Sequence, residues 1–291
     1  MSGSGVFVTV SVFSGRPNPH WELTPEQAAE LERHLTIPRG PTMQKPSGAT
    51  VGLGYRGIHI EWHQPALSSA MHVHGGVVGT ADMQPNYQDP GRSLEQWLLS
   101  TAPVGVPGVQ LQPEVDALIR DDLQSAASPA LPTGVAVTCP PCGGGAAPAY
   151  NPAAWNIPSV QPHNNCYNYA TNTITNTFAQ PGTGSGHPFA PPPDCPKVST
   201  GAHSDGLVGV PGFSASVPNG YYIALVIWPG FDFHWYRQDN NGCWSHKPGS
   251  TPVRNVDNAG NRITDPQHCN RGGYTIFCGY MTVSPGHITI R

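Results

Sequence analysis

Charged residues are scarce in this sequence. Of 291 residues, 14 are Lys or Arg and 18 are Asp or Glu, which is 11% charged residues with a formal net charge of −4. Soluble domains usually carry about 25%. Because no basic stripe exists, the chain lacks the electrostatic footprint of a nucleic-acid partner. The surface is expected to be neutral, which indicates an extracellular location or dense self-association.

Long apolar runs are also missing, so no membrane span is expected. The first residues, Met1–Gly5, have no basic flank, no long apolar core and no small-residue cleavage site, so they do not form a Sec signal. We therefore expect a protein that is extracellular or secreted by a non-Sec route. A cytoplasmic location stays open as the alternative.

No cysteine precedes Cys139, and the remaining sequence holds seven. An odd number leaves at least one thiol unpaired within a monomer, and the count suits three disulfides and one reactive cysteine. The spacing Cys139-Pro-Pro-Cys142 is also half of a zinc site, but a convincing second CxxC is missing, which favours disulfides. The disulfide candidates are Cys139, Cys142, Cys195, Cys243, Cys269 and Cys278.

Glycine (34) and proline (33) are abundant and lie among aromatic and β-branched residues, so they indicate turns and loops rather than disorder. We predict a small N-terminal α/β domain over 1–125 and an Ala/Pro/Gly-rich linker over 126–161. The second domain covers 162–291. In the first domain the patterns predict strands at 6–13, 57–63 and 71–79, and helices at 25–35, 94–99 (capped by Ser93) and 113–125.

The second domain is expected to start with a helix over 166–177 and a long loop over 180–205. Its clearest strands are 221–228, 232–238, 242–247 and 274–281. The whole chain is therefore predicted to be α+β.

The segment from Pro162 to Ala170 places a cysteine at a helix start. Asn164 or Asn165 can cap the helix, which puts Cys166 in its first turn. Unsatisfied backbone N–H groups and the positive end of the helix dipole favour a thiolate there, and the same donors can stabilise an oxyanion. Tyr167, Ala170 and Ile174 are expected to form the helix's apolar stripe. The other interpretation is a disulfide or a buried structural thiol.

Two histidines follow on a predicted hairpin. A three-residue loop with Gly242 in the left-handed conformation pairs Asp239 with Cys243. His246 then lies opposite Tyr236, on the same face as His234 and at the distance of a diagonal contact. This arrangement predicts His234 as a base and His246 as the residue that orients it. Asp232 and Asp239 are second choices for the orienting role, and ordinary packed histidines are the alternative to catalysis.

This order of residues resembles the NlpC-type cell-wall peptidases, over about half of the chain, and the resemblance implies a bacterial protein. The resemblance implies a papain-like domain of a helix and an antiparallel sheet, with Cys166, His234 and His246 as a Cys-His-His triad. Asn165, Tyr167 and His163 would contribute oxyanion or subsite contacts, although a solvent-exposed His163 is the simpler interpretation. The sequence departs from the family around the nucleophile, where Asn165, Tyr167 and Asn168 replace the usual Asp and Ser or Gly.

A weaker pattern of histidines lies in the N-terminal domain. His59, Glu61 and His63 alternate on one predicted strand, and His72 and His74 alternate on another, so the two strands would have to be neighbours to form a metal site. A solvent-facing sheet surface explains the same alternation, and no metal or other cofactor is expected.

We therefore expect a cysteine hydrolase or transferase that acts on an amide bond through a thioester on Cys166. Its substrate would be a peptide or protein, either in the cell wall or, for a secreted effector, in a host. The alternative is a structural or self-assembling extracellular protein on a papain-like scaffold, cross-linked by disulfides and inactive. The two differ in one property, because an enzyme needs a free thiol of low pKa at Cys166.

Overall fold

The computed structural model describes residues 5–36, 52–64, 67–80, 85–89, 91–103, 116–117, 119–120, 137–213 and 216–291. The chain divides into two compact units. Unit 1 contains Met1–Val12, Asn18–Val51 and Tyr55–Leu131, and unit 2 contains Phe13–Pro17, Gly52–Gly54 and Pro132–Arg291. The domain boundaries at residues 125 and 161 stay predictions.

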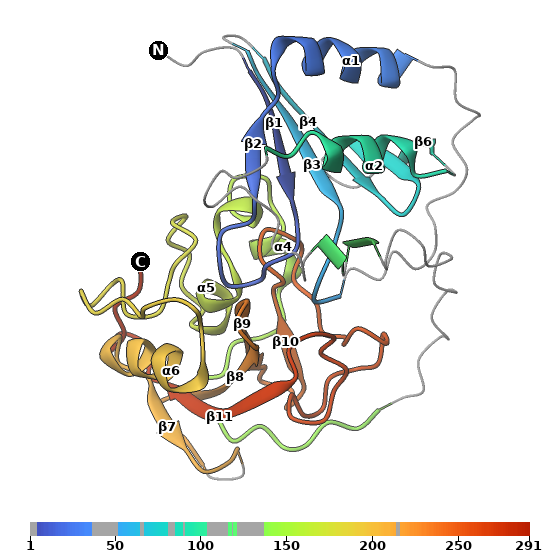
Figure 1. The fold of residues 1–291 in the computed structure, drawn as a ribbon. Helices are drawn as coiled ribbons and strands as arrows, with labels where there is room; N and C mark the ends of the chain where they lie inside the picture. The colour runs from blue at the N-terminus through green and yellow to red at the C-terminus, as the bar shows by residue number, and fades with distance from the viewer. Residues whose placement is uncertain are drawn as a thin grey trace. The chain divides into compact units, whose positions relative to one another are not determined.

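Unit 1 is built on a six-stranded sheet in the order β2-β1-β3-β4-β5-β6 (Figure 1). The strands are β1 (Gly5–Val10), β2 (His20–Glu22), β3 (Ile58–Gln64), β4 (Leu67–His74), β5 (Val77–Thr80) and β6 (Pro85–Gln88). Alternate apolar residues such as Val8, Val10, Ile58 and Ile60 are fully buried, as expected for a sheet with one face on a core. All pairings between these strands are antiparallel, so the unit is not an α/β fold in the strict sense.

Two helices accompany this sheet, α1 (Pro25–Thr36) and α2 (Ser93–Ser100). Thr24 and Gln27 exchange side-chain to backbone hydrogen bonds at the start of α1, which is a capping box. Ser93 does not cap α2 as predicted, because the Asp89 carboxylate accepts hydrogen bonds from Leu94 N and Ser93 Oγ. The predicted helix 113–125 lies outside the described residues except for 116–117 and 119–120, which are helical.

The single strand predicted over 71–79 is wrong. It is instead the end of β4 and most of β5, joined by a turn at Gly75 and Gly76. Both glycines have positive φ, 60° and 76°, a conformation that costs glycine little. The Gly-Gly pair was the local signal for this hairpin.

Unit 2 is built on a five-stranded sheet in the order β10-β9-β8-β11-β7. Its strands are β7 (Val208–Val210), β8 (Tyr221–Trp228), β9 (Asp232–Gln238), β10 (Trp244–His246) and β11 (Ile276–Val283), and its helical segments are α4 (Pro152–Trp155), η1 (Gln161–His163), α5 (Cys166–Ala170) and α6 (Cys195–Ser204). Every residue of β8 and β9 is buried, and residues of α5 and α6 pack with them in the core. The chain is thus α+β, as predicted.

Two predictions for the helices of unit 2 are wrong. Helix α5 ends at Ala170 rather than 177, since Asn172 adopts a left-handed φ of 52°, and Ile174 is 45% exposed instead of joining an apolar stripe. Helix α6 lies inside the loop predicted over 180–205. Asp194 caps α6 by accepting a hydrogen bond from Lys197 N, 2.8 Å away.

The described part of the predicted linker, residues 137–161, belongs to unit 2, where it includes a disulfide-bonded cysteine and helix α4. Residues 126–136 lie outside the described part of the chain. Within that part, no helix combines the length and apolar character needed to cross a membrane.

Candidate functional site

The start of α5 is fixed by Asn165. Its side-chain oxygen accepts hydrogen bonds from Tyr167 N and Asn168 N, and Asn168 Oδ1 accepts from Asn165 N in return. The Asn165 amide also donates to Gly15 O and Ala179 O, both at 2.8 Å. The predicted cap is therefore confirmed. The side-chain amide of Asn165 also binds the backbone at Gly15 and at Ala179.

Cys166 lies in the first turn of α5, as predicted, but its side chain is fully buried. Its Sγ is 4.0 Å from Phe233 O on β9. Burial raises the pKa of the Cys166 thiol well above its ordinary value, and the nearby Asp232 carboxylate raises it further. The thiol is therefore held protonated, which is the opposite of an activated nucleophile.

The predicted histidine hairpin is confirmed. Gly242 has a φ of 81°, Asp239 N donates to Cys243 O, and His246 pairs with Tyr236. His234 Nε2 lies 2.9 Å from His246 Nδ1. Because His246 Nε2 lies 3.1 Å from Val256 O, a neutral His246 donates to that carbonyl and accepts from His234.

Both imidazoles are buried and held by aromatic rings. The Tyr236 ring stacks on His246 with centroids 5.0 Å apart, and it meets His234 edge-on at 4.8 Å. The catalytic roles assigned to Cys166, His234 and His246 stay predictions. What the described contacts show is that each side chain is enclosed by protein.

The two alternative carboxylates have other partners. Asp232 accepts hydrogen bonds from the backbone N–H groups of residues 14, 15 and 16 and from the Tyr274 hydroxyl. Asp239 accepts from Ser245 Oγ at 2.9 Å and forms a buried ion pair with Arg237, 3.0 Å away. Both carboxylates therefore organise the fold.

Two buried cations of unit 2 were not predicted from the sequence. Arg237 donates to Asp239 and Tyr169 and lies 4.0 Å over the Tyr169 ring. Lys247 Nζ donates to the carbonyl oxygens of Gln161, Asn164 and Gly249 at 2.5–2.6 Å. A charged residue inside or directly after a buried strand was the available signal, because such a charge needs partners.

The remaining predicted subsite residues contribute to packing or lie in solvent. The Tyr167 hydroxyl donates to the buried Asp205 carboxylate at 2.9 Å. His163 is exposed, as the simpler interpretation expected.

The N-terminal histidines do meet across neighbouring strands. His59 pairs with His72 between β3 and β4, and their ring centroids are 4.6 Å apart. The ring centroids of His72 and His74 are 6.2 Å apart. His63 instead contacts Glu61 near the surface. Burial lowers the pKa of His59 to about 4. Within the described part of the chain, no group of three or more His, Cys, Asp or Glu residues could hold a metal ion.

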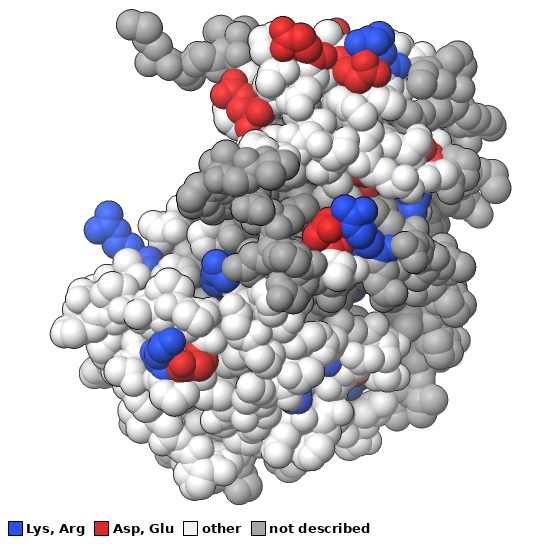
Figure 2. Space-filling model, in the orientation of Figure 1, with Lys and Arg blue, Asp and Glu red and all other residues white. Residues whose placement is uncertain are grey.

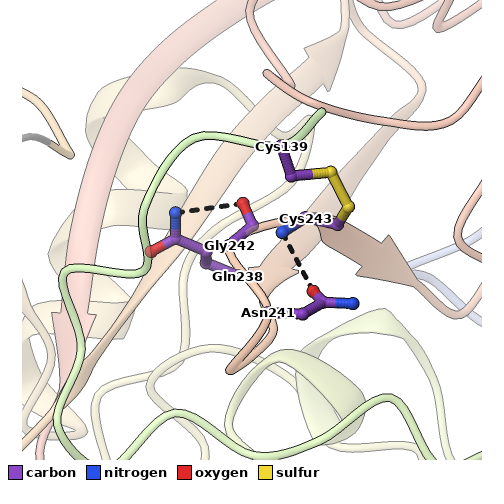
Figure 3. Close-up of a disulfide and its surroundings, with 5 residues drawn as sticks. All are labelled: Cys139, Gln238, Asn241, Gly242 and Cys243. Carbon is purple, nitrogen blue, oxygen red and sulfur yellow. Dashed lines mark hydrogen bonds between the residues drawn. A yellow bond between two sulfur atoms is a disulfide. The ribbon is translucent and has the colours of Figure 1, made fainter. Parts of the chain in front are cut away.

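Four of the six disulfide candidates are paired. Cys139 is bonded to Cys243 (Figure 3), and Cys195 is bonded to Cys278. The free cysteines are Cys142, Cys166 and Cys269. Because Cys139 is in a disulfide, it cannot serve as a thiolate ligand, so the zinc interpretation of Cys139 and Cys142 is wrong. Disulfides of this kind are typical of extracellular proteins.

No protein-family model matches the chain, and no solved structure matches it. One relative is insoluble matrix shell protein 1 of Ruditapes philippinarum, 48% identical over 136 residues. The match covers 47% of this chain and 90% of that protein.

The relative overturns the prediction of a bacterial cysteine hydrolase. The name of this relative describes a shell matrix protein, not an enzyme that cleaves amide bonds. Its source is a mollusc. The expected peptide substrate and bacterial export route lose their support with it. Since the match spans nearly the whole relative, the chain belongs to the family of insoluble matrix shell protein 1.

Proposed function

We propose that this protein is a structural, catalytically inactive component of an extracellular matrix, and that copies of it self-associate. The observation that carries the proposal is the 48% identity to a protein described as an insoluble matrix shell protein. The burial and raised pKa of the Cys166 thiol support the absence of catalysis.

The scarcity of surface charge supports self-association. Six charged residues of unit 2 are buried, namely Asp205, Asp232, Arg237, Asp239, Lys247 and Asp257. Figure 2 shows one face of the molecule, where red and blue atoms form small separate groups on a mainly white surface. Low charge reduces the electrostatic repulsion between copies and promotes association.

The internal bonding of unit 2 supports a structural role outside the cell. Its two disulfides join residues 104 and 83 positions apart, and such bonds persist in oxidising surroundings. We further propose that unit 2 is an inactive papain-like scaffold. The cysteine at the start of α5 and the histidine pair on the later hairpin support that likeness.

Sedimentation velocity of the oxidised full chain, over a wide concentration range, tests the proposal. We expect concentration-dependent association that changes little with added salt, because few surface charges are available for screening. In parallel, cell-wall stem peptides and casein should show no turnover, with the Cys166→Ala variant indistinguishable from the natural chain. A chain that stays monomeric throughout, or a turnover that depends on Cys166, would contradict the proposal.

A further inference from the structure

Three cysteines meet at the turn between β9 and β10. Cys243 ends this turn and is bonded to Cys139, with Cα atoms 5.0 Å apart. Cys142 is a free thiol three residues after Cys139. Its Sγ lies 3.9 Å from Gln238 Oε1 and 3.5 Å from Gly144 O. Gln238 Nε2 in turn donates to Gly242 O, beside the disulfide (Figure 3).

The backbone of residues 139–142 packs directly against the same turn. A Cβ on Gly242 would overlap the carbonyl oxygen of Pro140 and lie 3.2 Å from Cys142 N. The free thiol is therefore carried by a segment that touches the residue directly before Cys243. A disulfide and an unpaired thiol share one small site, which we name the three-cysteine site (Cys139, Cys142 and Cys243).

The two prolines between Cys139 and Cys142 oppose a disulfide between these two cysteines of one chain. Pro140 and Pro141 favour the extended polyproline conformation, whose rise would separate the Cα atoms of Cys139 and Cys142 by about 9 Å. A disulfide requires less than about 7 Å, and a second proline is disfavoured in the tight turn that would shorten the gap. Cys142 is thus held next to a disulfide without a route to pair with Cys139 of its own chain.

The other two free thiols are poorly placed for reaction. Cys166 is fully buried. Cys269 is partly buried, and burial raises the pKa of its thiol to about 12. Cys142 and Cys139 are both partly exposed, whereas Cys243 is only 7% exposed. An incoming thiolate would therefore reach the sulfur of Cys139 more easily than that of Cys243.

We propose that the three-cysteine site links copies of this chain covalently by thiol–disulfide exchange. The Cys142 thiolate of one copy attacks the Cys139 sulfur of a second copy. A bond between the two chains forms as the bond from Cys139 to Cys243 breaks, and Cys243 leaves as a thiolate that takes up the proton lost by Cys142. The number of disulfides is unchanged, so no oxidant is needed.

The linkage can propagate, because each copy supplies one attacking thiol and one disulfide to be attacked. A head-to-tail contact of this kind forms open chains unless its rotation closes a ring. The inference rests on the proposed self-association, since exchange needs two copies held close together.

The experiment mixes ¹⁴N- and ¹⁵N-labelled full chain at about pH 8 without oxygen and with a metal chelator, then blocks free thiols with iodoacetamide. We expect a ladder on non-reducing gels that dithiothreitol removes, and mixed-isotope peptides joining Cys139 to Cys142. The Cys142→Ser variant should form roughly tenfold fewer linked chains. The Cys269→Ser variant, which removes another partly buried free thiol, should match the natural chain.

The outcomes separate the linkage from self-association. If chains associate in dithiothreitol but no mixed-isotope peptide forms without it, self-association stands and the exchange inference fails. The inference also fails if Cys142→Ser gives the same ladder, or if Cys269 carries the link. Chains that stay monomeric under both conditions overturn both proposals.

Discussion

At the scale of single residues, the surroundings of Cys166 decide what its thiol can do. A helix start and a capping asparagine favour a thiolate, but full burial opposes any charge there and is the dominant cause of the raised pKa. A charge removed from water without a close counter-charge is costly, so the neutral thiol prevails. Cys166 therefore behaves as a small apolar core residue.

Alkylation of the native, unreduced protein tests this conclusion. With iodoacetamide we expect Cys142 to react first and Cys166 to react roughly 100-fold more slowly, until a denaturant exposes it. Mass-spectrometric mapping of each cysteine gives the rates. The Cys166→Ala variant should unfold about 1 kcal/mol more easily, the cost of a small cavity. Rapid labelling of Cys166 in the folded chain would show that its thiol is accessible and reactive.

His59 gives a second prediction at this scale. Its pKa is lowered to about 4, against about 6.5 in an unfolded chain, so the unfolded state binds more protons between these values. The contribution of neutral His59 to the free energy of unfolding should therefore be fully present above about pH 6.5. The free energy of unfolding should fall by about 1–3 kcal/mol as the pH drops towards 4. An NMR titration measures the pKa, and thermal melts at two pH values measure the loss.

The variant His59→Gln should flatten this pH dependence, leaving the part due to His72, whose pKa burial also lowers. His20→Gln changes an exposed histidine and should leave the dependence as it is. A titration of His59 near 6.5 would contradict the assignment.

At the scale of elements, the sequence predicted those features whose causes are local. The hairpin of β9 and β10 followed from apolar periodicity and a glycine turn, so the contact between His234 and His246 could be predicted too. Helix α6 was missed because prolines and glycines surround it, although Asp194 before Cys195-Pro196 is a recognisable cap. The early end of α5 was missed, since a left-handed asparagine such as Asn172 has no fixed sequence pattern.

Asn165 tests how much one cap contributes to the architecture. The Asn165→Ala variant removes the acceptor that begins α5 and the two donors to Gly15 O and Ala179 O, leaving buried backbone groups without these partners. We expect a loss of about 3 kcal/mol, measured by denaturant unfolding. Asn240→Ala, at an exposed turn position, should lose less than about 0.5 kcal/mol. Equal effects of the two variants would show that the cap is dispensable.

At the scale of the whole molecule, the sequence could not predict which groups become buried or paired. The burial of Cys166 depends on β9, whose residues lie more than sixty positions later in the chain. Cysteine pairing likewise depends on tertiary distance, since a count of seven is compatible with many connectivities. Residue spacing likewise predicted a catalytic triad but could not separate a hydrolase from a structural protein. The raised pKa of the Cys166 thiol and the similarity to a shell matrix protein favour the structural protein.

The two disulfides constrain the unfolded chain. They close loops of 104 and 83 residues, and chain entropy depends only on the logarithm of loop length, so each should stabilise the fold by about 4–5 kcal/mol. Guanidinium unfolding of Cys139→Ser/Cys243→Ser and of Cys195→Ser/Cys278→Ser measures this directly. Nearly equal losses indicate that loop closure dominates. A loss below about 1 kcal/mol for either pair would mean that native packing, rather than the cross-link, holds that part of unit 2 together.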